Sequence, residues 1–227
     1  MTPDGVHPLS LEFDFGDREL TIHPTVVETD HGLVLVDVGL PGAVDRLEPA
    51  LDDLGFALAD VSTVMLTHHD GDHAGGLSEL EEATDVFVVA HADEVPYVDG
   101  EEQPVKSPPD AERYPPVPVD LELVGDEVFR THAGPMRVVE TPGHAPGHVS
   151  LYFPDHRFLV AADALNNDDG FVGPKPEYTP DMATAIESVG TLADLDVETT
   201  HCYHGGTADA GTDAIREIYE SLSQSRQ

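Results

Sequence analysis

One ten-residue stretch concentrates residue types that bind metal ions. Residues 67–76 read Thr-His-His-Asp-Gly-Asp-His-Ala-Gly-Gly. The candidate ligands in it are His68, Asp70, Asp72 and His73, with His69 as a further candidate. Imidazole and carboxylate groups bind zinc at about 2.0–2.2 Å and also suit iron or manganese. Because chance rarely gathers so many ligand types in so short a run, the stretch predicts a metal site and not merely a solvated polar loop.

A second stretch, residues 141–148, reads Thr-Pro-Gly-His-Ala-Pro-Gly-His. Its Pro-Gly corners predict a tight loop. We expect this loop to place His144 at an exposed apex, while His148 begins the next strand.

The first stretch lies between a predicted strand and a predicted helix. Residues 61–66 are mostly apolar and predict a strand buried on both faces, whereas residues 77–83 predict a short helix. In an open α/β sheet, ligands usually bind at the carboxyl ends of the strands. Further strands are predicted over residues 9–15, 20–29, 33–38, 86–90, 121–124, 136–140, 148–153, 157–162 and 197–202. Further helices are predicted over residues 43–54, 181–195 and 212–222, with one or two helical turns over residues 91–98.

Two long loops interrupt these elements. Residues 99–118 contain six prolines and cannot form regular structure, and residues 166–176 are rich in Asn, Asp, Gly and Pro. A loop as long as the first is usually functional or disordered. It is either a lid or substrate-pocket wall or an irregular surface excursion.

Two apolar strands each end in an aspartate, at Asp37 and at Asp163. This weak internal repeat indicates two related αβ halves stacked face to face. Because nothing in the sequence marks a boundary between them, we expect a single domain over residues 1–227.

The charge of the chain is strongly acidic. Ten basic residues stand against 45 acidic ones, which gives a formal net charge of −35 for 227 residues, and only Lys106 and Lys175 are lysines. The low lysine content and the absence of Trp are typical of adaptation to concentrated salt, as in a haloarchaeon, where salt screens the self-repulsion. An acidic surface that recruits a basic partner is the competing interpretation. Non-specific duplex binding is disfavoured because it requires basic residues that face phosphates.

Other sequence features limit the classes of protein. Cys202 is the only cysteine, so no intrachain disulfide can form. The chain shows no secretory signal and no apolar run of the roughly 18–20 residues that span a bilayer. It also lacks a Gly-x-Gly-x-x-Gly or Walker loop, and therefore a nucleotide-cofactor motif. We expect a cytoplasmic protein with a small-molecule substrate and with neither nucleic acid nor membrane as a partner; its oligomeric state stays open.

The two stretches together resemble the metallo-β-lactamase superfamily. Its usual loop is His-x-His-x-Asp-His, followed downstream by Thr-Pro-Gly-His-Thr-x-Gly-His, and the resemblance spans about residues 20–206. It implies an α/β fold, a four-layer αββα sandwich of two packed sheets with helices outside. It also implies an active site along one edge of the sandwich.

The resemblance implies a site for two divalent metal ions. His68 and His144 match ligands of the first metal, and Asp72 and His73 match ligands of the second. Asp163 matches the carboxylate that bridges both metals. Zinc is the first expectation for both positions, with manganese or iron as alternatives.

The remaining family positions complete this assignment. His204 matches the last histidine ligand, whereas His148 matches a position that is usually structural. Asp37 is a candidate for orienting a ligand imidazole from behind. Asp70 stands where the family has its second histidine. As a ligand it would add a negative charge and favour Mn²⁺ or Fe²⁺; the alternative is that the first metal is weakly bound or lost.

The function implied is that of a metal-dependent hydrolase. A metal-bound hydroxide would attack a small ester, thioester or lactone. Asp72 is our candidate catalytic residue, which orients the nucleophile and passes its proton to the leaving group. Two alternatives remain on the same fold: an iron-dependent oxidoreductase similar to persulfide dioxygenases, and a non-catalytic metal-binding module. Fold alone cannot choose among substrates.

Overall fold

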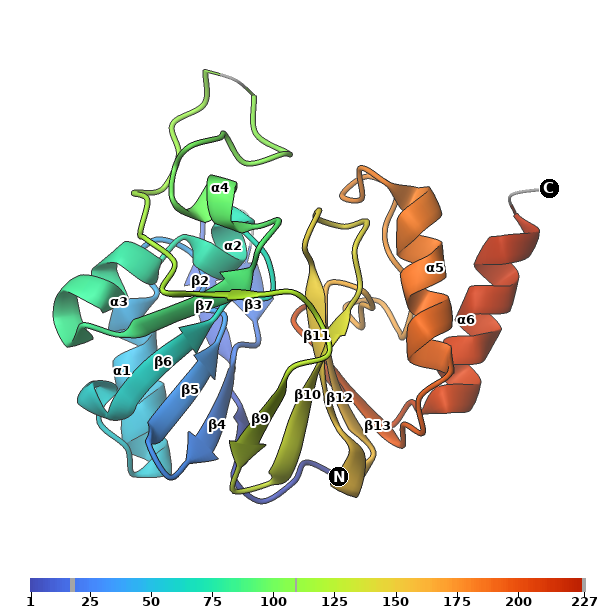
Figure 1. Cartoon of the computed structure of the whole chain (residues 1–227), viewed down its shortest axis with the longest axis horizontal. Helices are drawn as coiled ribbons and strands as arrows, with labels where there is room; N and C mark the ends of the chain where they lie inside the picture. The colour runs from blue at the N-terminus through green and yellow to red at the C-terminus, as the bar shows by residue number, and fades with distance from the viewer. Residues whose placement is uncertain (17–18, 109, 226–227) are drawn as a thin grey trace.

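Two six-stranded β-sheets pack face to face, with helices on both outer sides, in the computed structural model of the chain (Figure 1). The structure describes residues 1–16, 19–108 and 110–225. The predicted domain over residues 1–227 and the predicted loop over residues 99–118 include positions 17, 18, 109, 226 and 227, which lie outside the described residues.

The first sheet comes from the N-terminal half of the chain. Its strands, in spatial order, are β1 (Val6–Pro8), β4 (Thr25–Thr29), β5 (Gly32–Val36), β6 (Val61–Met65), β7 (Phe87–His91) and β8 (Leu121–Leu123). From β5 to β8 the strands run parallel. Parallel neighbours need crossover connections, and helices α1 (Val44–Leu54) and α3 (Leu77–Thr84) supply two of them and lie on the outer face of this sheet (Figure 1).

The second sheet comes from the C-terminal half. Its strands, in spatial order, are β14 (Gly206–Ala208), β13 (Thr199–Cys202), β12 (Phe158–Ala162), β11 (Val149–Phe153), β10 (Gly134–Glu140) and β9 (Val128–Thr131). Helices α5 (Met182–Ala193) and α6 (Thr212–Gln224) lie on its outer face (Figure 1). No helix among the described residues is both long and apolar enough to cross a lipid bilayer.

Three separate apolar layers hold the four structural layers together. Successive side chains of a strand point to opposite faces of its sheet, so a strand covered on both sides contributes to two layers. On β5, Leu35 belongs to the layer beneath α1 and α3, while Val36 belongs to the layer between the sheets. On β12, Val160 shares that central layer and Leu159 packs toward α5 and α6. The predicted four-layer αββα sandwich is therefore confirmed.

The central strands and long helices follow the predicted ranges within a few residues, and one predicted strand is wrong. Residues 20–29 do not form one strand, because the chain breaks at His23 and Pro24 into β3 (Glu19–Ile22) and β4. Proline has no N–H to donate to a sheet. Strand β3 instead pairs with β2 (Leu11–Asp14) in a small two-stranded sheet.

The short elements carry too few residues for a periodic pattern, and the sequence does not reveal most of them. Strands β1, β9 and β14 and helix α2 (Gly71–Ala74) are three or four residues long. Residues 91–98 contain the single helical turn α4 (Val95–Val98), in agreement with the one or two turns predicted there. The described residues of 99–118 contain neither helix nor strand, as their prolines predict.

Candidate metal centre

The loop of residues 67–76 begins at the carboxyl end of β6 and runs into α2. The side chains of His68, His69 and His73 are fully buried at this edge of the first sheet. A buried polar side chain requires a partner, because leaving it unpaired costs free energy. The partners of these three imidazoles show which of them are available to bind a ligand.

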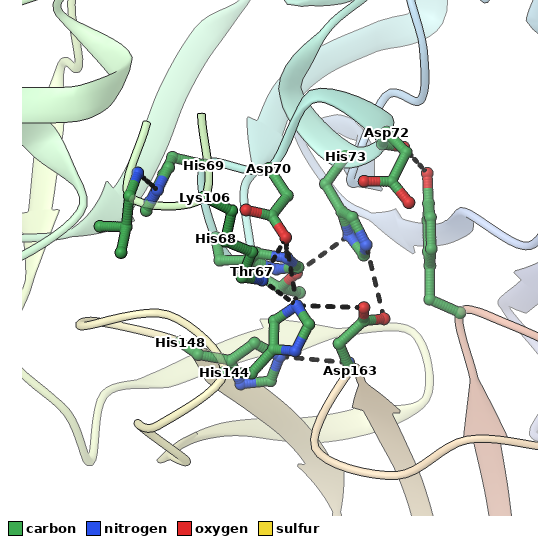
Figure 2. Close-up of polar contacts among 12 residues, drawn as sticks. Thr67, His68, His69, Asp70, Asp72, His73, Lys106, His144, His148 and Asp163 are labelled. Atoms are coloured by element: carbon green, nitrogen blue, oxygen red, sulfur yellow. Dashed lines mark hydrogen bonds and ion pairs between the residues drawn. The ribbon is translucent and has the colours of Figure 1, made fainter. Parts of the chain in front are cut away.

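Asp37 fixes two of the imidazoles from behind. Its carboxylate accepts hydrogen bonds from the backbone N–H and the hydroxyl of Thr67, at 2.8 and 2.7 Å, and lies 2.8 Å from His73 Nδ1. Thr67 Oγ1 in turn lies 3.1 Å from His68 Nδ1. These contacts occupy the Nδ1 atoms and direct the Nε2 atom of each ring toward the interior of the site (Figure 2). The predicted orienting position of Asp37 agrees with this arrangement.

Three polar atoms inside the site have no hydrogen-bond partner although they are buried. They are His68 Nε2, His73 Nε2 and Asp163 Oδ1. Buried polar atoms of native proteins are nearly always paired, and each exception requires an explanation. Two imidazole nitrogens and a carboxylate oxygen that lie close together, with 3.4 Å between His73 Nε2 and Asp163 Oδ1, form a donor set for a cation. The residues present therefore fit a bound metal.

The ligands predicted from distant parts of the sequence converge on the same place (Figure 2). His144 comes from the loop between β10 and β11, Asp163 follows β12, and His204 lies between β13 and β14. The backbone at Gly143 makes one of these approaches possible. Its φ is +122°, and a Cβ there would lie 2.3 Å from the backbone nitrogen of Ala185, so only glycine fits where the loop packs on α5.

The candidate ligands form three overlapping groups of three, and in each group the ligand atoms lie within 4.8 Å of one another. Two of the groups share no residue: a first group of His68, Asp70 and His144, and a second group of Asp72, His73 and His204. The third, His68, His73 and Asp163, takes one histidine from each of them. All seven residues predicted from the sequence are thus brought together, with Asp163 as the seventh. Asp163 Oδ2 lies 3.3 Å from His144 Nε2 and 3.5 Å from His204 Nε2, between the two groups.

The spacing of the donor atoms suits cations with tetrahedral coordination. Two ligand atoms that bind one tetrahedral ion at about 2.0–2.1 Å lie about 3.3–3.4 Å apart. Asp70 Oδ2 lies 3.3 Å from His68 Nε2 and 3.2 Å from His144 Nε2. In the other group, the distance from His204 Nε2 to Asp72 Oδ2 is 3.2 Å. The side chains are already spaced for coordination.

The electrostatic field of the site favours positive charge. Burial is the largest single effect on the pKa of His204 and lowers it, yet Asp163 and Asp72 together outweigh burial and raise this pKa to about 10. Burial also lowers the pKa of His73, but Asp37, Asp163 and Asp72 outweigh it and raise this pKa well above its usual range. Three carboxylates in one largely enclosed site thus stabilise any cation that enters it.

Two histidines near the site serve other purposes. His148 Nδ1 lies 2.8 Å from Thr141 Oγ1, and its Nε2 accepts a hydrogen bond of 3.1 Å from the backbone N–H of Asp163. Burial lowers the pKa of His148 to about 3, which keeps the ring neutral and able to accept. It positions the backbone of Asp163, and both of its ring nitrogens already have hydrogen-bond partners. His69 is likewise excluded as a ligand, because Glu94 contacts its Nδ1 and the backbone N–H of Val105 donates to its Nε2.

The expectation of an exposed His144 is wrong. The residue is 5% exposed. Its ring packs edge-on against His68, with the ring centres 4.8 Å apart, and Lys106 contacts its Nε2. The Pro-Gly corners describe the local turn but not the opposite sheet and loop that cover it.

Three further residues of the site escaped the sequence analysis. Tyr203 stacks on His73 with ring centres 3.7 Å apart and donates from its hydroxyl to the backbone oxygen of Asp72 at 2.5 Å. Glu94 and Lys106 reach the metal loop from residues 94–106. The only signal for Lys106 in the sequence is the rarity of lysine, and for Tyr203 its position next to His204.

A cavity of about 310 Å³ opens above both groups of ligands. Lys106 of the Pro-rich loop and Asn166, Asp168 and Lys175 of the loop over residues 166–176 line it. Of the two interpretations of the Pro-rich loop, the structure supports the pocket wall. A cavity of this size suits part or all of a small-molecule substrate.

The chain matches one protein family along most of its length. The family model described as the metallo-beta-lactamase superfamily covers residues 18–204. The probable metallo-hydrolase YflN of Bacillus subtilis (strain 168) is 32% identical over 203 residues, which are 77% of this chain and 76% of that protein. A hydroxyacylglutathione hydrolase of Cereibacter sphaeroides is 36% identical over 131 residues, 58% of this chain. That alignment covers 42% of the relative, so it spans less than half of that protein.

Solved structures show the same architecture. A metallo-beta-lactamase family protein from Thermus thermophilus superposes with a TM-score of 0.76 and 26% identity over 98% of this chain and 79% of that one. BJP-1, a subclass B3 metallo-beta-lactamase of Bradyrhizobium japonicum, matches the fold with a TM-score of 0.71 at 19% identity, over 99% of this chain and 93% of that one. The family match and the similarity to metallo-hydrolases show that the chain is a hydrolytic enzyme and belongs to the metallo-beta-lactamase superfamily.

Proposed function

We propose that this protein hydrolyses a small ester, thioester or lactone with the help of two divalent metal ions, zinc in the first place, with manganese or iron as alternatives. One observation carries the proposal. Buried atoms of His68, His73 and Asp163 that have no hydrogen-bond partner among the described residues converge beneath a cavity of about 310 Å³. An apolar or fully hydrogen-bonded pocket would not leave such atoms without a hydrogen bond.

Each cation has its own ligand group in this proposal. His68, Asp70 and His144 hold the first, Asp72, His73 and His204 hold the second, and Asp163 lies between them. When bound, divalent cations polarise a substrate carbonyl and lower the pKa of a water molecule toward neutrality. The residues of the chain position these partners at the bottom of the cavity.

Asp72 is the proposed catalytic residue. Its side chain is 29% exposed, lines the cavity and lies 3.2 Å from His204 Nε2. Although burial opposes it, the neighbouring His73 and His204 lower the pKa of Asp72, so its carboxylate is ionised. An ionised carboxylate at the cavity floor can orient an attacking water, accept its proton and pass that proton to the leaving group.

The relatives support an acyl substrate without choosing one. Some are named hydroxyacylglutathione hydrolases, and an acylglutathione is a thioester. The formal net charge of −35 argues against a nucleic-acid substrate. We therefore propose a small-molecule substrate. We also propose a cytoplasmic location.

The test combines metal analysis with a substrate panel. Protein purified in concentrated salt is analysed for bound metal per chain and assayed on esters, thioesters and lactones, before and after removal of the metal by a chelator. We expect divalent metal and hydrolysis that is lost with the metal and restored on its return. A single iron with oxygen-dependent turnover would identify an oxidoreductase instead, and bound metal without turnover of any class would indicate a binding module.

A further inference from the structure

Lys106 extends from the Pro-rich loop into the first group of ligands (Figure 2). Its ammonium forms an ion pair with Asp70 Oδ2 and donates to His144 Nε2 at 2.5 Å. The second group differs. Among the ion pairs of the described residues, Asp72 pairs with His204 and with no lysine or arginine. A lysine ammonium thus contacts one of the two ligand groups only.

The ammonium and the first cation require the same atoms. His144 Nε2 has a single lone pair, which accepts a hydrogen bond from an ammonium or binds a metal, but not both. Asp70 Oδ2 also lies 3.3 Å from His68 Nε2, so it belongs to the ligand set of the first cation. A cation that enters this position must therefore displace Lys106.

The loop that carries Lys106 is anchored to the metal loop. The backbone N–H of Val105, the preceding residue, donates to His69 Nε2 at 3.1 Å. His69 is itself held by Glu94, and its backbone oxygen accepts a hydrogen bond of 2.6 Å from Tyr114. His69 and Glu94 are fully buried. The backbone beside Lys106 is thus fixed, and the long side chain is what can turn toward or away from the ligands.

The chemistry of the two partners is matched. Asp70 stands where the superfamily has a histidine, and only a carboxylate can form an ion pair with an ammonium. The chain has just two lysines, and both line this cavity. The second, Lys175, lies 3.4 Å from Asp168 Oδ2 and does not contact the ligand groups. Lys106 is therefore the lysine of this cavity that contacts candidate metal ligands directly.

We propose that Lys106 is an internal competitor for the first cation. The position formed by Asp72, His73 and His204 fills first, and the position formed by His68, Asp70 and His144 fills only after the ammonium turns out into the cavity. This rests on the proposed function, because it assumes that both groups bind divalent cations. It adds that the occupancy of the first position depends on metal concentration and on Lys106.

The test measures stepwise binding of Mn²⁺ to metal-free protein by calorimetry in concentrated salt, for the wild type, Lys106→Met and Lys175→Met. We expect two binding steps in the wild type. In Lys106→Met the weaker step tightens by about tenfold or more, since one ion pair no longer has to be broken. The stronger step changes by less than about threefold. Lys175→Met, the matched control from the same cavity, leaves both steps unchanged.

Thermal unfolding of the metal-free variants shows whether each is folded, and gives a second measurement. Added Mn²⁺ should raise the melting temperature of Lys106→Met more than that of the wild type, because tighter binding to the folded state stabilises it more. Two equally tight binding steps in both proteins would overturn the proposed competition. So would a weaker step that is no tighter in Lys106→Met than in the wild type. Either result would leave the proposed hydrolase function standing. Failure of every variant to bind any metal would overturn the proposed function and this inference with it.

Discussion

The two ligand groups are built from the same residue types but are prepared differently. In the second group, Asp37 contacts His73 from behind, and Tyr203 stacks on the same ring and donates to the backbone of Asp72. In the first group, a loop lysine contacts Asp70 and His144 directly. One group is therefore supported from behind by Asp37 and Tyr203, while a lysine ammonium contacts the ligand atoms of the other. Identical ligand chemistry does not guarantee equal affinity, because groups around the ligands decide what each position binds.

Asp163 is the residue that the two groups share, so its loss should have the largest effect. Asp163→Asn removes the negative charge between His144 and His204. We expect hydrolysis to fall by on the order of 10³-fold or more and both metal-binding steps to weaken. Metal content per chain and kcat/KM on the best substrate of the panel measure this. Unchanged binding at either position would show that Asp163 does not lie between two cations.

Removing one histidine from each group separates the two positions. His204→Ala should abolish the tighter of the two binding steps, since it removes a ligand from the second group. His144→Ala should weaken only the other step. The comparison is made by calorimetry with Mn²⁺ on both variants under the same salt conditions. If the two variants lose the same step, the division into two groups is wrong.

Asp37→Asn tests the rigid support of the second group. Asp37 accepts from His73 Nδ1, and a neutral amide polarises that imidazole less than a carboxylate does. Loss of such an orienting partner usually costs about 10–100-fold in metal affinity. We expect this loss at the tighter step, with a smaller change at the weaker one, which Asp37 reaches only through Thr67. Equal losses at both steps would contradict the asymmetry.

Asp70→His sharpens the comparison from the other side. The substitution restores the histidine typical of the superfamily and removes the carboxylate that pairs with Lys106. We expect the weaker step to tighten by about tenfold and the preference between Zn²⁺ and Mn²⁺ to move toward Zn²⁺, because imidazole suits zinc better than a carboxylate does. Competition between the two metals for the apo variant and the wild type measures the preference. If Asp70→His instead weakens binding at the position of His68, Asp70 and His144, aspartate is the better ligand there.

The smallest effect on metal binding is expected at His201. It lies on β13 near His204, but both of its ring nitrogens have partners outside the ligand groups. His201 Nδ1 lies 2.9 Å from Thr207 Oγ1, and its Nε2 donates to the backbone oxygen of His23. Burial lowers its pKa to about 4. His201→Gln should leave both metal-binding steps within about twofold of the wild type.

The same residue predicts a pH effect on the stability of the metal-free protein. Between about pH 6.5 and 4 the unfolded chain protonates this imidazole while the folded one does not, so the folded state loses stability as the pH falls through this window. The contribution is at most about 1.4 kcal/mol per pH unit. Denaturant unfolding at pH 7 and pH 5 should show a smaller loss for His201→Gln than for the wild type. An equal loss in both would mean that other groups account for the pH dependence.

The local sequence predicted the parts of this site that depend on neighbours along the chain. The apolar run of β6, the ligand types that follow it and the corners around His144 are all visible in short windows. The apolar runs that become β5 and β12 likewise predicted strands, each ending at an aspartate. The structure adds that both strands are buried on both faces. The resemblance to the metallo-beta-lactamase superfamily supplied the pairing of distant ligands, since no short window shows that His144 and His204 meet.

What the sequence could not show are contacts between side chains that are far apart along the chain and leave no periodic pattern. Lys106 reaches Asp70 across 36 positions, and Glu94 reaches His69 across 25. The burial of His144 was mispredicted for the same reason, because the residues that cover it come from other loops.

The sequence by itself determined the types of ligand, their order and the strands that end beside them, because these depend on short-range patterns of polarity and spacing. The tertiary structure alone decided which imidazole nitrogens face inward, which histidines support and which bind, and that an ammonium of the protein sits at one of the two cation positions. Those features depend on distances of a few ångströms between segments that are joined only when both sheets are packed together.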